Sequence, residues 1–279
     1  MLVHSTWRDK CGVFGVYAPD EDVARITFYG IYALQHRGQE SAGIATADGY
    51  RIHLRTGMGL VSQVFDENDL GHLPGHIAIG HTRYSTTGSS RHENAQPVYV
   101  DGTHGALALA HNGNLVNAEM LRYDLEERGA SFVTTTDTEV VARMLASAPG
   151  ADWVERCANT MKTIAGAYCL IVLTPDSLIA MRDPYGVRPL CIGKLPPGGG
   201  PSYGGNGNGG WIVASETCAL DHLGAEFVRE VEPGEAIVID REGLRAVQAV
   251  EKRRDALCVF EYIYFARPQP AHPAGDASA

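Results

Sequence analysis

A cysteine near the start of the chain has the chemistry of a nucleophile that could carry its own base. Cys11 follows residues 1–10 and precedes the apolar run Gly12–Tyr17. Removal of residues 1–10 as a leader would give Cys11 a free α-amine. Such an amine, with a pKa of about 7.7–8.0, can accept the proton of a thiol with a pKa of about 8.5. The alternative is an inert role, because most free cysteines pack as small buried hydrophobic residues.

Four polar segments elsewhere in the chain have a composition that packing alone does not require. They are Gln35–Gly43, His81–Thr86, His111–Asn114 and Thr134–Glu139. Each lies beside an apolar run or a helical pattern, so the sequence predicts four loops. Loops held by a rigid scaffold are where reactive groups are usually presented.

The patterns around these segments predict an α+β fold. Apolar runs typical of strands occur at Gly12–Tyr17, Ala42–Ala45, Ile77–His81, Ala106–His111, Tyr168–Leu173, Leu178–Met181, Pro189–Ile192, Trp211–Ala214 and Ala236–Ile239. Helical periodicity occurs at Ala24–Leu34, Ala118–Arg128, Thr138–Ser147, Trp153–Ile164 and Cys218–Leu223, with Asn117 and Asp137 as predicted N-caps. Strands in adjacent groups, with helices between the groups, favour two packed sheets covered by helices.

Composition argues against several classes of partner. With 279 residues, 44% of them hydrophobic, the chain can form one large domain or two small ones. A formal net charge of −10 argues against a nucleic-acid or anionic-membrane partner. No apolar run is long enough to span a bilayer, and residues 1–10 lack the apolar core of a secretory signal. The six cysteines are scattered without a Cys-x-x-Cys pair, as in a reduced, cytoplasmic protein.

Several segments, in this order and rough spacing, resemble motifs of the class II glutamine amidotransferases, which use an N-terminal nucleophile. These segments are Cys11–Gly15, His36–Gly43, His81–Thr86, His111–Asn114, Thr136–Glu139, Arg182–Leu190 and Ala214–Thr217. Within that family, Leu34–Gly43, Tyr84–Gly88 and Phe260–Pro268 are similar to the amidophosphoribosyltransferases. The resemblance implies a four-layer αββα sandwich of two mostly antiparallel sheets, as in the N-terminal nucleophile hydrolases.

The resemblance also implies roles for five residues. Cys11 would attack the side-chain amide of glutamine and form a thioester, with release of ammonia. The side-chain amide of Asn112 and the backbone N–H of Gly113 would stabilise the oxyanion. Arg83 would bind the α-carboxylate of glutamine, and Asp137 its α-ammonium group.

Each of these residues also has a structural interpretation. Arg83 could be a surface arginine paired with an acid, Asn112–Gly113 a hairpin turn, and Asp137 only a helix N-cap. Their joint occurrence with Cys11 favours the catalytic interpretation. Three histidines in these segments lack metal-ligand spacing and are interpreted as structural: His36, His81 and His111.

The resemblance further implies that a second domain is missing. Residues 1–10 would be a leader, 11–250 the amidotransferase domain, 251–268 the start of an absent phosphoribosyltransferase domain, and 269–279 a disordered tail. Mg²⁺ and the iron–sulfur cluster of some relatives would belong to the missing domain. Cys258 matches the position of one cluster ligand, and without the others it would be an ordinary thiol. No cofactor is therefore expected in this chain.

Three hypotheses for function follow. The first is the glutaminase half of an amidophosphoribosyltransferase-like enzyme, which would supply ammonia for 5-phosphoribosylamine in purine synthesis, in one interpretation with a separately encoded phosphoribosyltransferase domain. The second is a class II amidotransferase for another acceptor. The third is a non-catalytic glutamine-binding or regulatory module with an uncleaved leader. The apolar run Val259–Phe265, without a second domain to cover it, also predicts self-association into a homo-oligomer.

Overall fold

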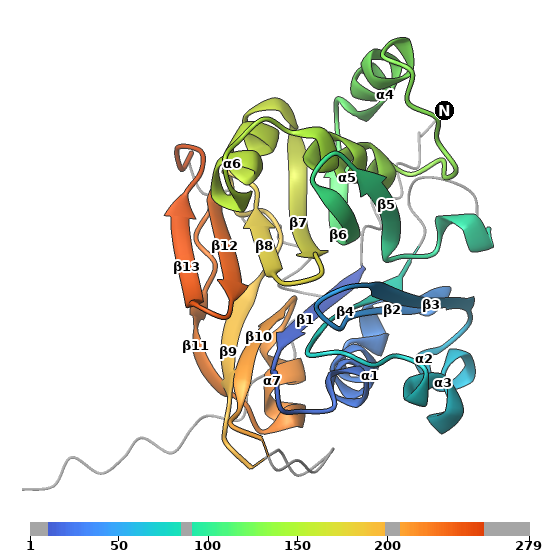
Figure 1. The fold of residues 1–279 in the computed structure, drawn as a ribbon, viewed down its shortest axis with the longest axis vertical. Helices are drawn as coiled ribbons and strands as arrows, with labels where there is room; N and C mark the ends of the chain where they lie inside the picture. Colours follow the sequence, from blue (N-terminus) through green and yellow to red (C-terminus); the bar gives the residue numbers. More distant parts are fainter. Residues whose placement is uncertain (1–10, 85–90, 199–206, 254–279) are drawn as a thin grey trace, which may run out of the picture.

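The fold consists of two β-sheets packed face to face, with helices on both outer surfaces (Figure 1). The computed structural model describes residues 11–84, 91–198 and 207–253. This layered α+β sandwich of antiparallel sheets confirms the fold class predicted from the sequence. Among the helices in these ranges, none combines the length and the apolar character needed to cross a membrane.

The first sheet places the strand after Cys11 near its centre. All of its seven strands pair antiparallel, in the spatial order β11 (Glu226–Glu230), β9 (Cys191–Leu195), β10 (Gly210–Ala214), β1 (Gly12–Tyr17), β4 (Ile77–Arg83), β2 (Ser41–Ala47) and β3 (Ile52–Met58). Val13 and Ser215 add two bonds of 3.0 Å to this pairing, one to the Ser215 Oγ and one from the Ser215 N–H to the Val13 carbonyl. The start of β1 is therefore held on both sides.

The second sheet contains a strand that extends beyond its neighbour. Its six antiparallel strands are, in order, β13 (Gly243–Gln248), β12 (Glu235–Asp240), β8 (Leu178–Arg182), β7 (Gly166–Leu173), β6 (Gly105–Leu115) and β5 (Val98–Gly102). The pairing of β5 with β6 stops at Val98, which lies opposite Leu109. Beyond that point, the last residues of β6 pair with β7 alone.

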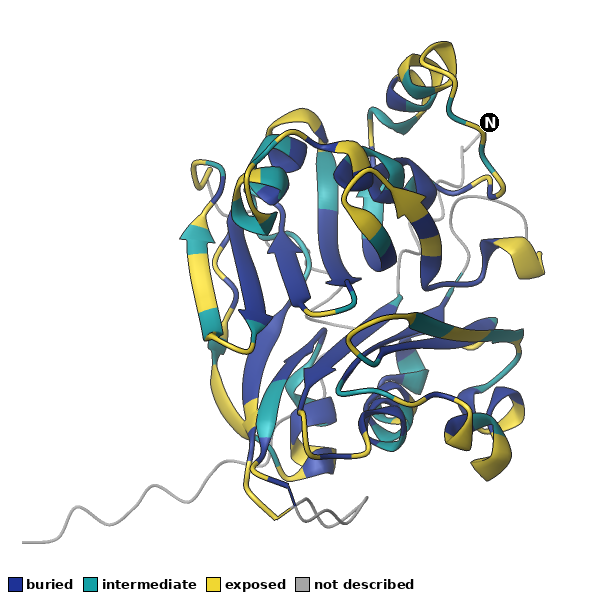
Figure 2. Cartoon of the chain, in the orientation of Figure 1, coloured by how far each residue is buried: buried dark blue, intermediate teal, exposed yellow. Residues whose placement is uncertain are grey.

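Three apolar clusters fill the spaces between the layers. Successive side chains of a strand point to opposite faces of its sheet. In β1, Phe14 and Val16 therefore pack under the helices, whereas Val13 and Tyr17 point between the two sheets. Figure 2 shows the result, with buried inner strands and exposed outer surfaces on the helices.

The helices divide between the two outer surfaces. The first sheet is covered by α1 (Val23–Ala33), α2 (Val61–Val64) and α7 (Thr217–Leu223), with α3 (Glu67–Gly71) beside α1. The second is covered by α5 (Asp137–Ser147) and α6 (Trp153–Thr163), and α4 (Ala118–Glu127) packs against α5. The N-cap of α5 is Thr136, so the prediction that Asp137 caps this helix is wrong. Asn117 occupies the N-cap position of α4, but its side chain bonds to Thr163 and Ala165 instead of capping its own helix.

Two of the four predicted loops are strand. His81–Arg83 continues β4, and His111–Asn114 continues β6, so Asn112–Gly113 is not a hairpin turn. Most of these polar residues are buried, so a polar composition did not by itself indicate a loop. The strand predicted at Pro189–Ile192 begins later, at Cys191. Four strands were not predicted at all: β3, β5, β11 and β13.

Candidate active site

Four of the five predicted site residues line one small pocket, where β1 begins and β4 and β6 end. Cys11 precedes β1, Arg83 ends β4, Gly113 lies in β6 and Asp137 begins α5. The pocket is completed by Tyr84, Gln96, His111 and Thr136. Its volume of about 20 Å³ corresponds to one water-sized molecule.

Cys11 is half-buried, and a buried arginine fixes its backbone. The Cys11 Sγ lies 3.7 Å from the carbonyl oxygen of Tyr84. The carbonyl oxygen of Cys11 accepts a 3.0 Å hydrogen bond from the Nε of Arg37. The guanidinium of Arg37 also pairs with Glu216, which His36 contacts at 3.1 Å. Burial raises the pKa of Glu216, but hydrogen bonds from His36 and Arg37 outweigh that effect and lower the pKa overall. Glu216 is therefore a carboxylate that compensates the buried cation.

Arg83 is not the surface arginine of the structural interpretation, because it is only 3% exposed. Its Nη1 donates a 2.8 Å hydrogen bond to the Oε1 of Glu40. The backbone N–H of Glu40 in turn donates to the carbonyl of Arg83 at 3.0 Å. These contacts orient the guanidinium at the pocket wall. A guanidinium has five N–H donors in a planar fork whose geometry matches a carboxylate.

Asp137, whose side chain is 10% exposed, places a negative charge in the same pocket. Its Oδ2 accepts a 2.9 Å hydrogen bond from the N–H of Leu115, and its Oδ1 lies 3.4 Å from the Nδ1 of His111. Burial raises the pKa of Asp137, but the His111 ring and the backbone hydrogen bonds outweigh this effect and lower the pKa below its usual value. The pocket therefore combines an arginine cation with a carboxylate that stays ionised.

Asn112 does not line the pocket, but it lies in β6 between His111 and Gly113, which do. Its side chain alternates to the same face as that of Ala110, which points between the sheets, towards the sheet that carries Cys11. Within the described residues, neither the amide nitrogen nor the amide oxygen of Asn112 has a hydrogen-bond partner. Leaving such a buried group unsatisfied costs about 1–3 kcal/mol. Asn112 is thus a buried donor whose hydrogen-bonding capacity is unused.

The edge of β6 that extends beyond β5 brings backbone N–H groups to the pocket. Alternate residues of a strand direct their N–H groups to the same edge. On this edge, the N–H of His111 donates to the Oε1 of Gln96 at 2.8 Å. The N–H of Leu115 donates to Asp137 at 2.9 Å. Gly113 lies between these two residues, and its N–H is directed to the same edge.

The neighbouring strand supports this orientation of Gly113. In the register of β6 with β7, Gly113 lies opposite Tyr168, whose own N–H and carbonyl both bond to Asp183. The two residues therefore do not form a hydrogen-bonded pair. Gly113 has a φ of 151°, and a Cβ at this position would lie 2.0 Å from the carbonyl oxygen of Ala167. Only glycine fits here.

Several residues that shape the pocket were not identified from the sequence as site residues. They are Arg37, Glu40, Gln96, Thr136 and Glu216, together with His111, which was interpreted as structural only. Arg37 and Glu40 lie within a segment that resembles the family. The sequence around Gln96 does not indicate its role, because that role depends on where β5 begins to pair with β6.

One cluster outside the pocket has atoms that could hold a metal ion. Side-chain atoms of His36, Glu216 and Cys218 lie within 4.8 Å of one another. The carboxylate of Glu216 is already paired with the Arg37 cation, which disfavours a second positive charge. We therefore assign no metal to it. Cys258, matched in sequence to an iron–sulfur ligand, lies outside the described residues.

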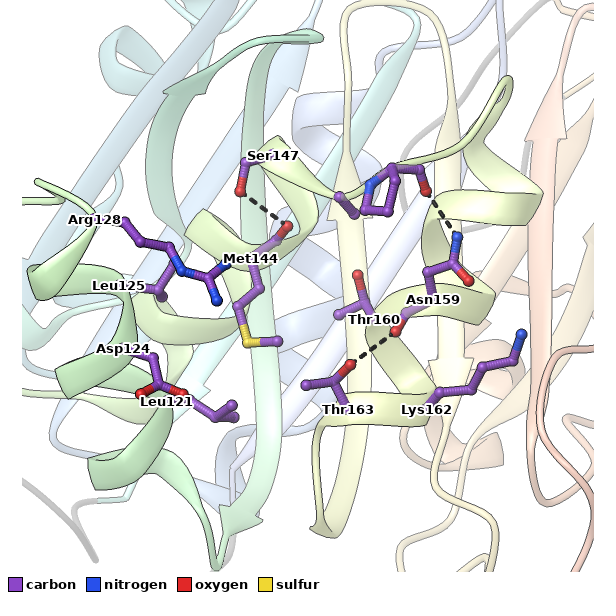
Figure 3. Close-up of a pocket in the computed structure, with 12 residues that line it drawn as sticks. Leu121, Asp124, Leu125, Arg128, Met144, Ser147, Asn159, Thr160, Lys162 and Thr163 are labelled. Atoms are coloured by element: carbon purple, nitrogen blue, oxygen red, sulfur yellow. Dashed lines mark hydrogen bonds between the residues drawn. The ribbon is translucent and has the colours of Figure 1, made fainter.

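A larger cavity, of about 510 Å³, lies away from these residues between α4, α5 and α6 (Figure 3). Its wall includes Leu121 and Leu125. Three of its polar side chains bond within the protein: Ser147 to the carbonyl of Arg143 at 2.8 Å, Asn159 to that of Pro149 at 2.8 Å and Thr163 to that of Asn159 at 3.1 Å. None of the predicted site residues lines this cavity, so the smaller pocket is the candidate active site.

Comparisons with known proteins agree with the motifs. The family described as "Glutamine amidotransferase domain" matches residues 81–222. An amidophosphoribosyltransferase of Synechocystis sp. is 53% identical over 263 residues, which are 93% of this chain and 51% of that protein. One from Archaeoglobus fulgidus is 45% identical over 92% of this chain and 54% of its own length. The structure of glutamine phosphoribosylpyrophosphate amidotransferase from B. subtilis, complexed with ADP and GMP, matches with a TM-score of 0.82 and 40% identity, over 92% of this chain and 53% of that one.

The chain spans about half the length of these relatives. The family match extends from the end of β4 through β6 and α5 to α7. It therefore includes Arg83, Asn112, Gly113 and Asp137, and the longer alignments cover nearly the whole chain. This protein belongs to the class II family of glutamine amidotransferases and is similar, within that family, to the amidophosphoribosyltransferases.

Proposed function

We propose that this chain hydrolyses glutamine to glutamate and ammonia through a thioester on Cys11. One observation carries the proposal: a single pocket contains a cysteine, a buried arginine, a carboxylate and the edge of β6 that bears Gly113. This combination supplies a nucleophile, two charges for a free amino acid and donors for an oxyanion. The structural interpretations of the single residues do not explain why these residues lie in one pocket.

The proposed reaction begins with the sulfur of Cys11. Once residues 1–10 are removed, the free α-amine takes the thiol proton, and the thiolate attacks the side-chain amide carbon of glutamine. The C–N bond then breaks, the amine returns a proton to the leaving nitrogen, and ammonia departs. A water molecule attacks the thioester, which releases glutamate and restores the thiol. The bond from Arg37 to the carbonyl of Cys11 holds the nucleophile's backbone during these steps.

Two groups on β6 are suited to stabilise the oxyanion. The N–H of Gly113 is directed to the pocket edge between two N–H groups that are already bonded, those of His111 and Leu115. The amide of Asn112 is buried and has unused hydrogen-bonding capacity among the described residues. Donors fixed in advance in a buried site cost no reorganisation when charge develops. Loss of one such donor typically raises the barrier by about 2.7–4 kcal/mol.

The charged residues support selection of a free amino acid. The guanidinium of Arg83 can pair with an α-carboxylate, and the ionised Asp137 with an α-ammonium group. A glutamine residue within a peptide has neither of these charged groups. We therefore propose that free glutamine is the substrate and that peptide-linked glutamine is excluded.

We also propose that the ammonia serves a phosphoribosyltransferase reaction, which makes 5-phosphoribosylamine for purine synthesis. The support is the similarity to amidophosphoribosyltransferases, which are about twice as long as this chain. The acceptor-binding part would lie in a second domain, separately encoded or continuous with this one. Mg²⁺ and the iron–sulfur cluster would belong to that domain. This chain by itself is expected to release ammonia without making phosphoribosylamine.

The test combines intact-mass measurement with a glutaminase assay. The mature, active protein should begin at Cys11, with the mass of residues 1–10 lost, and the Cys11→Ala variant should release no glutamate from glutamine. Retained activity in Cys11→Ala, or activity in a chain that keeps residues 1–10, would overturn the mechanism. A chain that binds glutamine without hydrolysing it and keeps residues 1–10 would instead indicate the regulatory module.

A further inference from the structure

The backbone of His111 is held by two side chains rather than by a neighbouring strand. Its N–H donates a 2.8 Å hydrogen bond to the Oε1 of Gln96, and its carbonyl oxygen lies 3.1 Å from the Nε2 of His81. A carbonyl can only accept, so the Nε2 of His81 carries the proton and donates. Both side chains are buried, at 5% exposed for Gln96 and 0% for His81. These are the bonds that a neighbouring strand would supply if β5 continued.

The two side chains come from different parts of the fold. Gln96 precedes β5 in the second sheet, whereas His81 belongs to β4 in the first sheet. The bond from His81 therefore joins the two sheets directly. His81 lies two residues before Arg83 in β4 and opposite Val13 of β1. The residue that accepts this bond, His111, immediately precedes Asn112 in β6.

We propose that Gln96 and His81 are positioning residues that clamp the backbone of His111 and thereby fix Asn112 and Gly113 for oxyanion binding. The inference rests on the proposed glutaminase function. The end of β5 leaves the N–H of Gly113 accessible to the pocket, but it also leaves that edge of β6 without a strand to hold it. The clamp resolves this conflict, because it supports the edge one residue before the donors and leaves the edge open at Gly113.

A positioning role makes a specific kinetic prediction. The clamp bonds to the backbone of His111, next to the oxyanion donors, and not to the carboxylate or guanidinium proposed to bind the ends of glutamine. Displacement of the oxyanion donors should therefore lower kcat, by about 10- to 100-fold, and change KM much less. A general loss of structure would instead lower the amount of active protein or change both constants.

The first experiment measures amide hydrogen exchange at His111 by NMR in the wild type and in Gln96→Met. Methionine keeps the length of the side chain and removes the acceptor. We expect the His111 amide to be protected in the wild type and to exchange about tenfold faster in the variant, as loss of one net hydrogen bond implies. Unchanged exchange would overturn the clamp, whatever the activity of the protein.

The second experiment compares kcat and KM for glutamine in His81→Leu and His81→Gln. Leucine removes the donor, whereas the amide nitrogen of glutamine can occupy the place of Nε2. We expect His81→Leu to lose kcat and His81→Gln to recover most of the loss. Equal kcat in both variants and the wild type would overturn the positioning role.

Thr46→Val is the matched control. Thr46 is also fully buried and donates a 2.8 Å hydrogen bond to a backbone carbonyl, that of Pro74, but it lies outside the pocket. Loss of that bond should leave kcat unchanged. A wild-type chain without glutaminase activity would overturn the proposed function, whereas an active wild type with unaffected clamp variants would overturn only this inference. Should His81→Leu fail to fold, Gln96→Met and His81→Gln still decide the outcome.

Discussion

Arg37 donates a 3.0 Å hydrogen bond from its Nε to the carbonyl oxygen of Cys11, and the same guanidinium pairs with Glu216. Residues from two separate parts of the chain thus fix the backbone of the candidate nucleophile. The Arg37 side chain is fully buried, so its charge requires compensation inside the protein. This arrangement links the stability of the fold to the geometry of the pocket.

Glu216→Gln should therefore destabilise the protein strongly. The substitution leaves the Arg37 guanidinium buried without its carboxylate, and removal of one partner from a buried pair typically costs about 3–5 kcal/mol. The free energy of unfolding, from urea titration, measures the effect. Glu67→Gln is the control, because Glu67 pairs with Arg25 at an exposed site and should change stability by less than about 1 kcal/mol. Similar small changes in both variants would contradict the assignment.

Gly113→Ala should abolish glutaminase activity and destabilise the fold. A Cβ at this position meets the carbonyl oxygen of Ala167 at 2.0 Å, so β6 and β7 have to separate at the proposed oxyanion site. Gly105→Ala is the matched control in the same strand, because Gly105 also has a positive φ, of 98°, but an added Cβ there meets nothing within 4 Å. Circular dichroism melts and the glutaminase assay compare the two. Equal effects would show that backbone strain alone, and not the contact with β7, makes glycine necessary.

Asp137→Asn should raise KM for glutamine by about 10- to 100-fold with a smaller effect on kcat. The reason is the loss of a charge-assisted bond to the α-ammonium group, worth about 1.5–3 kcal/mol. The pKa of Asp137 is lowered, so the wild-type carboxylate should stay ionised throughout the neutral range. Steady-state kinetics at pH 7 test this, with Asp124→Asn on the exposed surface of α4 as control. An unchanged KM would remove Asp137 from the substrate site.

His81 should make the protein less stable in mild acid. Burial lowers the pKa of His81 from 6.5 to about 3, so the unfolded chain binds a proton between these values and the folded chain does not. The contribution of neutral His81 to the free energy of unfolding is complete above pH 6.5. It is lost as the pH falls towards 3, by at most about 1.4 kcal/mol per pH unit. His81→Gln does not titrate there. Urea unfolding at pH 7 and pH 4.5 should therefore show a smaller acid loss in the variant, and an equal loss would contradict a buried neutral histidine.

The sequence identified the inner strands but not the outer ones. The four unpredicted strands, β3, β5, β11 and β13, are the edge strands of the two sheets. An inner strand such as β12 is buried on both faces and reads as a continuous apolar run. An edge strand such as β3, with the sequence Ile52-His-Leu-Arg-Thr-Gly-Met58, is half-exposed and owes its structure to pairing with β2. Local composition does not contain that information.

The candidate site could be predicted where residues lie in segments that resemble the family. Cys11, Arg83 and Asp137 lie in or beside such segments and line the same pocket, and their roles stay predictions. Gln96 could not be found, because its importance arises from the end of β5 and the unpaired edge of β6. His81 was interpreted as structural, and only the fold reveals which carbonyl it contacts.

The two hydrogen bonds between Val13 and Ser215 join residues that are 202 positions apart. During synthesis, β1 leaves the ribosome first, but its neighbour β10 becomes available only when most of the domain has been translated. A nascent or interrupted chain therefore has the thiol of Cys11 without a site around it. The reactive centre is completed late, and incomplete translation products should be unable to release ammonia.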